Sequence, residues 1–223
     1  MSVLECIEIE TAPNPRSTVI VLHGLGADGN DFVPIARELQ LDAVGPVRFV
    51  FPHAPVMPVT INNGHQMRAW YDILGFDRGS REDEAGLRKS QAAVEQLIAG
   101  QQARGIPASR IVLAGFSQGC AMSLLTGLRY SEPLAGIAGL SGYLPLALQT
   151  AAERSQANAA TPIFLAHGSE DNVVLIDRAR ASLQMLQQLG YGVEWGEYPM
   201  GHSVCMEEVA DLNRWLLKVL APA

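Results

Sequence analysis

The segment Gly-Phe-Ser-Gln-Gly at 115–119 forms a Gly-x-Ser-x-Gly motif. In a nucleophile elbow of this pattern, a serine on a tight turn between a strand and a helix attacks an acyl carbon. Glycines two residues before and after the serine let the strand and the helix approach closely. An apolar run at 111–114 precedes the motif, and a helical stretch of small residues at 120–130 follows it. The motif therefore predicts a nucleophile at Ser117.

A serine nucleophile needs a base and an acid that orients the base. On a fold with this elbow, the acid and then the histidine follow the serine along the chain, each in a loop after a strand. Asp171 follows the expected strand at 162–166, and His202 follows the expected strand at 193–198. We expect His202 to take the proton of Ser117, and Asp171 to accept a hydrogen bond from the other nitrogen of the His202 ring. Glu170 and Asp177 are the alternatives for the acid.

Two backbone N–H groups are expected to stabilise the oxyanion that forms during acyl transfer. One belongs to Gln118, at the start of the helix, where N–H groups point outward. The other comes from the glycine-rich loop at 23–30, with Leu25 as the first candidate and Gly26 as the second. The glycines of this loop also match a dinucleotide-binding fingerprint, but no ribose-binding acid follows the next strand.

A long stretch at 52–81 has weak periodicity and several large apolar side chains. Structureless connections of this length are commonly functional, so the stretch could line an acyl pocket. The other interpretation is an apolar loop that packs on the body of the protein for stability. The predicted pocket residues are Met67, Trp70, Tyr71, Leu74, Phe116 and Val173.

Short apolar runs alternate with longer amphipathic stretches along the chain, which predicts a mostly parallel central sheet flanked by helices on both faces. The first strand is expected to be an antiparallel edge strand, and 144–160 a short surface helix with a loop. Length and composition favour a single domain over 1–223. The expected strands are 4–10, 18–22, 47–51, 110–114, 134–140, 162–166 and 193–198, and the long helices are 84–104, 177–189 and 206–220.

Composition excludes several other classes of protein. The net charge is −7 and no basic stripe occurs, so nucleic acid is not expected as a partner. No apolar run approaches the roughly 20 residues of a membrane span, and the N-terminus lacks the pattern of a signal peptide, which favours a cytoplasmic location. The three cysteines form no disulfide framework, and no zinc motif occurs. We therefore expect no metal.

Five segments together resemble a known group of α/β-hydrolases, the bacterial carboxylesterase, lysophospholipase and acyl-protein thioesterase group. The resemblance implies an α/β-hydrolase fold without a large cap domain, acting on acyl ester or thioester bonds without a cofactor. It gives family roles to Ser117, Asp171 and His202 as the triad and to the Leu25 and Gln118 N–H groups as the oxyanion hole, with Trp70 beside the acyl pocket. The segments are 23–28, 70–72, 115–119, 167–171 and 199–202.

Two residues depart from the pattern of this group. Cys120 stands where the group usually has a second glycine after the elbow, which could narrow the packing of helix against sheet. Arg68 places a charge where the group is usually uncharged, and this leaves the preferred acyl chain open.

The first functional hypothesis is a serine carboxylesterase that hydrolyses small to medium acyl esters through an acyl-enzyme intermediate. The second is an acyl-protein thioesterase or a lysophospholipase on the same fold. A non-catalytic α/β binding module is the alternative from a different class, although no member of the triad is missing. An exposed edge strand or loop would support a homodimer.

Overall fold

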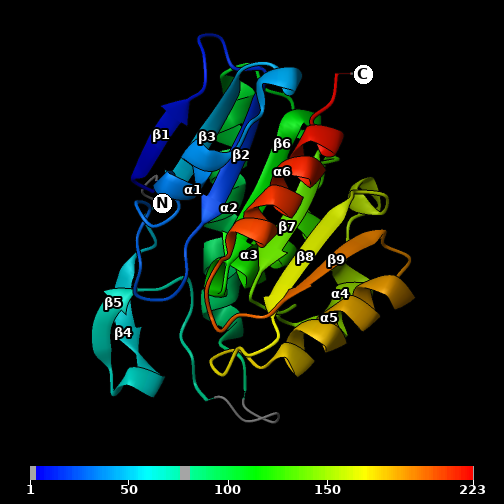
Figure 1. Cartoon of the computed structure of the whole chain (residues 1–223). Helices are drawn as coiled ribbons and strands as arrows, with labels where there is room; N and C mark the ends of the chain where they lie inside the picture. The colour runs from blue at the N-terminus through cyan, green and yellow to red at the C-terminus, as the bar shows by residue number, and fades with distance from the viewer. Residues whose placement is uncertain (1–3, 76–80, 223) are drawn as a thin grey trace.

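The computed structural model describes residues 4–75 and 81–222. A seven-stranded sheet forms its centre, and every neighbouring pair of strands is parallel except the edge strand β1, which is antiparallel to β3 (Figure 1). This confirms the expected fold, including the antiparallel edge. In spatial order the strands are β1 (Cys6–Glu10), β3 (Val47–Pro52), β2 (Ser17–Leu22), β6 (Ile111–Phe116), β7 (Gly136–Leu140), β8 (Ile163–Gly168) and β9 (Val193–Tyr198).

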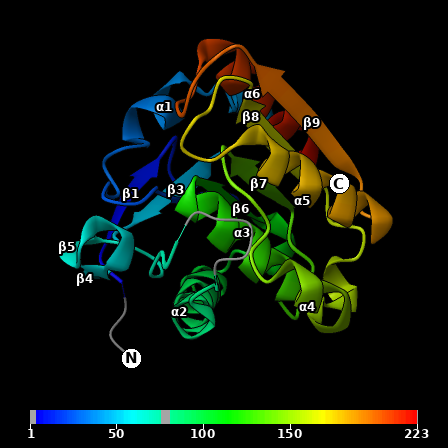
Figure 2. The same cartoon turned by 90° about the horizontal axis from the view of Figure 1, so that it is seen from below.

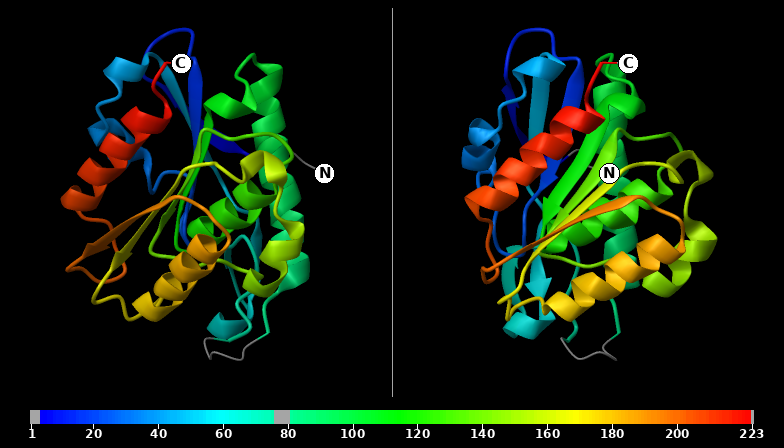
Figure 3. Two further views of the ribbon diagram at one scale, coloured as in Figure 1. Left: turned by 90° about the vertical axis from the view of Figure 1, so that its right-hand side faces the viewer. Right: turned by 45° about the vertical axis from the view of Figure 1, so that its right-hand side comes forward.

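Helices cover both faces of the sheet, as Figures 2 and 3 show. Helices α1 and α6 lie on one face, and α2, α3, α4 and α5 lie on the other. The long helices agree with the sequence prediction to within one residue. Helix α1 was not predicted, because none of its residues is buried and its sequence shows no periodic apolar stripe. The helices are α1 (Val33–Glu38), α2 (Glu84–Ala103), α3 (Gln118–Arg129), α4 (Ala147–Glu153), α5 (Ile176–Gln188) and α6 (Met206–Val219).

Strands β6 and β7, in the middle of the sheet, are apolar throughout because both of their faces are buried. In β6, Ile111 and Leu113 pack with α2 and α3, while Val112 and Ala114 pack with α6 on the opposite face. Alternating side chains of a strand point to opposite faces, so a strand between two helical layers needs apolar residues at every position. The same arrangement fixes the end of β6, where the Gly-x-Ser-x-Gly motif turns into α3.

The expectation of a structureless connection at 52–81 is wrong over its first part. The chain forms a hairpin of β4 (Val56–Val59) and β5 (His65–Arg68), which lies beside the main sheet (Figure 1). Each strand has four residues, and Pro58 and the polar start of β5 hide the alternation that would reveal a longer strand. Residues 76–80 of the predicted loop lie outside the described part of the chain.

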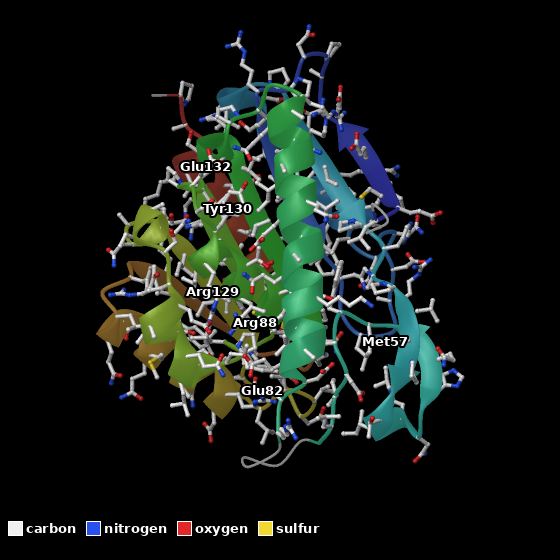
Figure 4. The ribbon with its side chains drawn as sticks, turned by 180° about the vertical axis from the view of Figure 1, so that it is seen from behind. Met57, Glu82, Arg88, Arg129, Tyr130 and Glu132 are labelled. Atoms are coloured by element: carbon white, nitrogen blue, oxygen red, sulfur yellow. The ribbon has the colours of Figure 1, made fainter. Side chains whose placement is uncertain are left out.

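An ion-pair network ties together the helices on the face that carries α3. Glu153 of α4 accepts hydrogen bonds from Arg88 of α2 at 2.6 Å and from Arg129 of α3 at 2.7 Å. Figure 4 shows the two arginines beside α2. The Arg129 side chain is buried, so this pair is screened less by solvent than a surface pair. The network therefore helps to fix the helix that begins immediately after Ser117.

Among the helices in residues 4–75 and 81–222, none has the length and apolar character needed to cross a bilayer.

Glu208 is a fully buried acid in the first turn of α6, six residues after His202. Neither of its carboxyl oxygens makes a hydrogen bond of ordinary geometry to a described residue. Burial raises the pKa of Glu208 to about 8, and the backbone N–H of Cys205 opposes this only partly. The folded protein therefore holds a proton on Glu208 at neutral pH, whereas the unfolded chain loses it near its ordinary pKa.

In the wild type, the buried Glu208 lowers the stability of the fold increasingly as pH rises from about 4.5 to about 8. We expect Glu208→Gln to remove this loss. Unfolding releases a proton over this range, so higher pH favours the unfolded state, by about 2–4 kcal/mol at pH 7. Thermal melting of the wild type and Glu208→Gln at pH 5, 6.5 and 8 measures the effect. We expect the variant to melt about 5 °C or more above the wild type at pH 8 and close to it at pH 5.

Two buried histidines define the range of pH that isolates Glu208. Burial lowers the pKa of His23 and of His167. The stability that these neutral rings contribute to the fold therefore rises with pH and is complete above the ordinary pKa of histidine. Between pH 6.5 and 8 the difference between the two proteins therefore reports Glu208. A difference in melting temperature that stays constant from pH 6.5 to 8 would show that Glu208 releases no proton on unfolding in this range, and would contradict the raised pKa.

Candidate active site

Ser117 lies at a strained turn between β6 and α3. Its backbone has φ 56° and ψ −115°, a conformation that a residue with a side chain rarely adopts, and its N–H donates to the Leu140 carbonyl at 2.8 Å. A Cβ on Gly115 would overlap the backbone of Gly119, and a Cβ on Gly119 would overlap the carbonyl oxygen of Leu22. Both glycines are thus required by the close approach that the motif predicts.

His202 lies between Ser117 and Asp171. Its Nε2 is 3.0 Å from the Ser117 hydroxyl oxygen, and its Nδ1 is 2.7 Å from Oδ2 of Asp171. Because a carboxylate only accepts, Nδ1 carries the proton and Nε2 faces the hydroxyl as an acceptor. The Phe116 ring packs against the imidazole, with 4.8 Å between the ring centroids. An imidazole held in this way can remove the hydroxyl proton as the oxygen attacks an acyl carbon.

The Asp171 carboxylate has no exposed surface and is held by several donors. Its Oδ1 accepts hydrogen bonds from the backbone N–H groups of Val173 and Val174, both at 2.9 Å. Its Oδ2 faces His202 and also lies 3.3 Å from Nε2 of His167, which donates to the Val174 carbonyl at 2.7 Å. Burial lowers the pKa of His167, so this histidine is neutral and acts through hydrogen bonds.

The two alternative acids lie elsewhere. Glu170 is exposed, and Asp177 is exposed on α5, with its Oδ1 3.9 Å from a guanidinium nitrogen of Arg180. Asp171 is the acid whose carboxylate is hydrogen-bonded to His202, at 2.7 Å.

The loop at 23–30 lies against Ser117. A Cβ on Gly24 would be 3.4 Å from the Cβ of Ser117. The N–H of Gly26 donates to the Arg68 carbonyl at 2.8 Å and is therefore not free for a ligand. Neither the Leu25 N–H nor the Gln118 N–H donates to another residue in the described part of the chain. This removes the second candidate and leaves the expected pair of donors, Leu25 and Gln118.

Buried hydrogen bonds fix this loop to the rest of the site. His23 donates from Nδ1 to the Gly24 carbonyl at 2.7 Å and accepts at Nε2 from the Ala54 N–H at 3.0 Å. Burial lowers the pKa of His23, which keeps the ring neutral and able to accept. The indole N–H of Trp70 donates to the His23 carbonyl at 2.9 Å. Hydrogen bonds of the His23 side chain and of the His23 carbonyl thus hold the loop in place.

The Gln118 side chain has a role that the motif does not reveal. Its Oε1 accepts from the Trp70 N–H at 3.0 Å, and its Nε2 donates to the Tyr71 carbonyl at 2.9 Å. The residue that follows Ser117 therefore fastens α3 to the segment after the hairpin. No local sequence signal marks these contacts, because they join residues 47 and 48 positions apart.

A cleft opens beside Ser117. Three of the six predicted pocket residues, Tyr71, Leu74 and Val173, line it. Leu74 and Val173 are 44% and 52% exposed, so they form an apolar rim that solvent reaches. The other lining residues are Asp72, Ile73, Gly75, Arg81, Glu82, Asp83, Gln118, Tyr143, Val174 and Arg178. Sequence reasoning missed Tyr143 and Arg178, which come from other parts of the chain.

The remaining three predicted pocket residues do not line this cleft. Trp70 is 1% exposed and packs in the core. Phe116 packs between the rings of His202 and Phe32. Met67 lies on β5 with its sulfur near Gly26, against the 23–30 loop. These three side chains pack against the segments that form the site and do not face the cleft.

The two departures from the family pattern are both accommodated. The Cys120 side chain lies against Gly139 and Gly142, where a Cβ on either glycine would overlap it. Burial raises the pKa of the Cys120 thiol to about 12, which makes it a poor nucleophile. Arg68 donates to the Ala54 carbonyl at 2.8 Å and so holds the start of the hairpin instead of lining the cleft. Within residues 4–75 and 81–222, no group of three His, Cys, Asp or Glu side chains could hold a metal ion.

The relatives found by comparison with known proteins agree with one another. The sequence model of the phospholipase/carboxylesterase family matches residues 4–220. Acyl-protein thioesterase 1 of Neurospora crassa is 42% identical over 92% of this chain and 87% of its own length. Acyl-protein thioesterase 1 of Mycosarcoma maydis is 40% identical over 99% of both chains.

Solved structures agree with these relatives. Arabidopsis thaliana SOBER1 superposes with a TM-score of 0.87 at 33% identity, covering 92% of this chain and 99% of that chain. Zea mays acyl-protein thioesterase 2 superposes with a TM-score of 0.84 at 27% identity, covering 96% and 99%. The chain therefore belongs to the phospholipase/carboxylesterase family and is a hydrolase with the α/β-hydrolase fold.

Proposed function

We propose that this protein is a serine hydrolase that cleaves acyl thioesters, including those on proteins, through an acyl-enzyme on Ser117. The hydrogen-bonded series from Ser117 through His202 to Asp171, with spacings of 3.0 and 2.7 Å, is the observation that carries the proposal. The same series argues against a non-catalytic binding module, since such a module has no need for an imidazole between a hydroxyl and a buried carboxylate.

Each step uses groups that lie at the site. The Ser117 oxygen attacks the acyl carbon while Nε2 of His202 takes the hydroxyl proton, and the carbonyl electrons move onto the oxygen. The N–H groups of Leu25 and Gln118 stabilise that oxyanion. The intermediate collapses, the bond to the leaving group breaks, and His202 returns the proton to the departing thiolate or alkoxide. Water then repeats the sequence, releases the acid and restores Ser117.

The relatives favour thioesters over the small to medium acyl esters of the first functional hypothesis. Relatives at 42% and 40% identity over at least nine-tenths of this chain are named acyl-protein thioesterase 1. A carboxylesterase activity is the second candidate, supported by the similarity to esterase PE8, with a TM-score of 0.83 at 26% identity. An acyl-enzyme on serine can form from a thioester or from an oxyester. The two candidate functions therefore differ in the relative rates at which these bonds are hydrolysed.

Matched substrates separate the two candidates. We expect kcat/KM for an S-octanoyl thioester to equal or exceed that for the corresponding O-octanoyl ester, because a thiolate leaves more readily than an alkoxide. A lysophospholipid with the same acyl chain forms a third arm. A clear preference for the oxyester would favour the carboxylesterase, and no hydrolysis of any of the three would refute the proposed function.

A further inference from the structure

Arg178 is a cation on the wall of the cleft that contains Ser117. Its guanidinium carbon lies 3.6 Å from the centroid of the Tyr143 ring. The Tyr143 hydroxyl is in turn 2.9 Å from the hydroxyl of Tyr71, and all three side chains line the same cleft. A guanidinium stacked on a ring keeps a fixed plane and leaves the N–H groups of its edge available.

None of the three carboxylates that line the described part of the cleft, Asp72, Glu82 and Asp83, forms an ion pair with Arg178. The contrast with Arg180, two residues later on α5, is direct. Arg180 lies 3.0 Å from Glu197 and 3.9 Å from Asp177. Arg178 instead is half-buried against an aromatic ring and faces the cleft. A partly desolvated cation gains more from an anionic ligand than an exposed one does.

Three carboxylates also line the cleft, and two of them are fully engaged. Asp83 accepts hydrogen bonds from the N–H groups of Gly86 and Asp72. Asp72 accepts from the N–H and the hydroxyl of Thr60. These four oxygens serve the local fold, so they compete little for a cation in the cleft.

Glu82 is the carboxylate that opposes Arg178. One of its oxygens accepts from the Leu146 N–H at 3.0 Å, and Figure 4 shows the residue near the start of α2. Burial raises the pKa of Tyr143, with Arg178 lowering it and Glu82 raising it, so both charges act on this tyrosine. Arg178 and Glu82 are thus opposite charges on the wall of the cleft, and Arg81 is a second arginine among its lining residues.

We propose that Arg178 binds an anionic group of the substrate, a carboxylate or a phosphate, while Ser117 attacks the acyl carbon. This inference rests on the proposed function and narrows its substrate class to acyl compounds with a negative charge near the scissile bond. The Tyr143 hydroxyl lies beside the guanidinium and shares a hydrogen bond with the Tyr71 hydroxyl. The anion belongs either to the acyl chain or to the leaving group, and the two pairs of substrates described below separate these cases.

Pairs of esters that differ in one charge test the proposal. In the first pair the acyl chain ends in a carboxylate or a methyl group: p-nitrophenyl hydrogen glutarate against p-nitrophenyl valerate. In the second pair the leaving group carries the charge: 4-acetoxybenzoate against its methyl ester. For each pair, the ratio of kcat/KM for the anionic ester to that for the neutral ester is measured. This ratio does not depend on the fraction of folded enzyme.

Arg178→Gln is expected to lower this ratio about ten- to a hundredfold for the pair whose charge reaches the arginine, as the loss of one charge-assisted hydrogen bond predicts. Arg178→Lys keeps the charge without the planar stack and should give an intermediate ratio. Glu82→Gln should raise the ratio, because it removes the opposing charge. Arg180→Gln is the matched control on the same helix, and we expect its ratio to equal that of the wild type.

The pair that responds identifies the part of the substrate that carries the anion. If Arg178→Gln and Arg178→Lys leave both ratios unchanged while the neutral esters are hydrolysed, the proposal for Arg178 is overturned and the proposed function stands. If the wild type hydrolyses none of the four esters and no thioester, the proposed function itself fails.

Discussion

Replacing Ser117 with alanine is expected to lower kcat for thioester and oxyester hydrolysis by about 10⁴- to 10⁶-fold. The reason is geometric: the 3.0 Å contact with His202 gives the enzyme its activated oxygen, and alanine leaves the imidazole with nothing to deprotonate except water. The N–H groups of Leu25 and Gln118 remain in the variant, so a small residual rate above the uncatalysed reaction is expected. Steady-state hydrolysis and labelling with a fluorophosphonate measure the two effects, and the label should be lost with the hydroxyl.

Ser203→Ala provides the control for this experiment. Ser203 is exposed and directly follows His202, but its hydroxyl takes no part in the series from Ser117 to Asp171. We expect kcat to stay within about twofold of the wild-type value, as for most surface substitutions. If Ser117→Ala kept a tenth of the wild-type turnover, another nucleophile would have to be sought.

The grouping of Ser117, Asp171 and His202 could be predicted because it depends on strand order and direction alone. The three residues follow β6, β8 and β9, which are parallel, so their carboxyl ends meet at one edge of the sheet. The motif at 115–119 sets the first position, and the expected strands at 162–166 and 193–198 locate the other two. The sequence signal is strongest for β6, which is apolar at every position, whereas β9 at the edge of the sheet carries Glu194 and Glu197.

The lining of the cleft could not be predicted to the same degree. Trp70 looks like a pocket residue by its type, but the depth at which a side chain lies depends on contacts with distant segments, here Gln118 and His23. Tyr143 lies in the loop between β7 and α4, and Arg178 lies on α5, so their stacking contact joins positions that no periodicity links. Short strands with a proline, such as β4, carry too few residues for alternation to show.

Replacing Asp171 with asparagine is expected to lower kcat by about 10⁴-fold while the fold and the position of His202 are kept. The direction of the amide follows from the two N–H donors of Val173 and Val174, which require an oxygen at the position of Oδ1. The amide nitrogen of the new residue must then face Nδ1 of His202. A donor at that position favours the tautomer with the proton on Nε2, which cannot accept the proton of Ser117.

Glu170→Gln is the matched control, because Glu170 is the neighbouring, exposed carboxylate that does not contact His202. Both variants are compared with the wild type by kcat, by the rate of fluorophosphonate labelling and by thermal melting. A large loss in kcat and labelling rate for Asp171→Asn, with Glu170→Gln unaffected, assigns the acid to Asp171. If both variants retained wild-type rates, the carboxylate 2.7 Å from Nδ1 would serve only to hold the loop, and the base would have to act without an orienting acid.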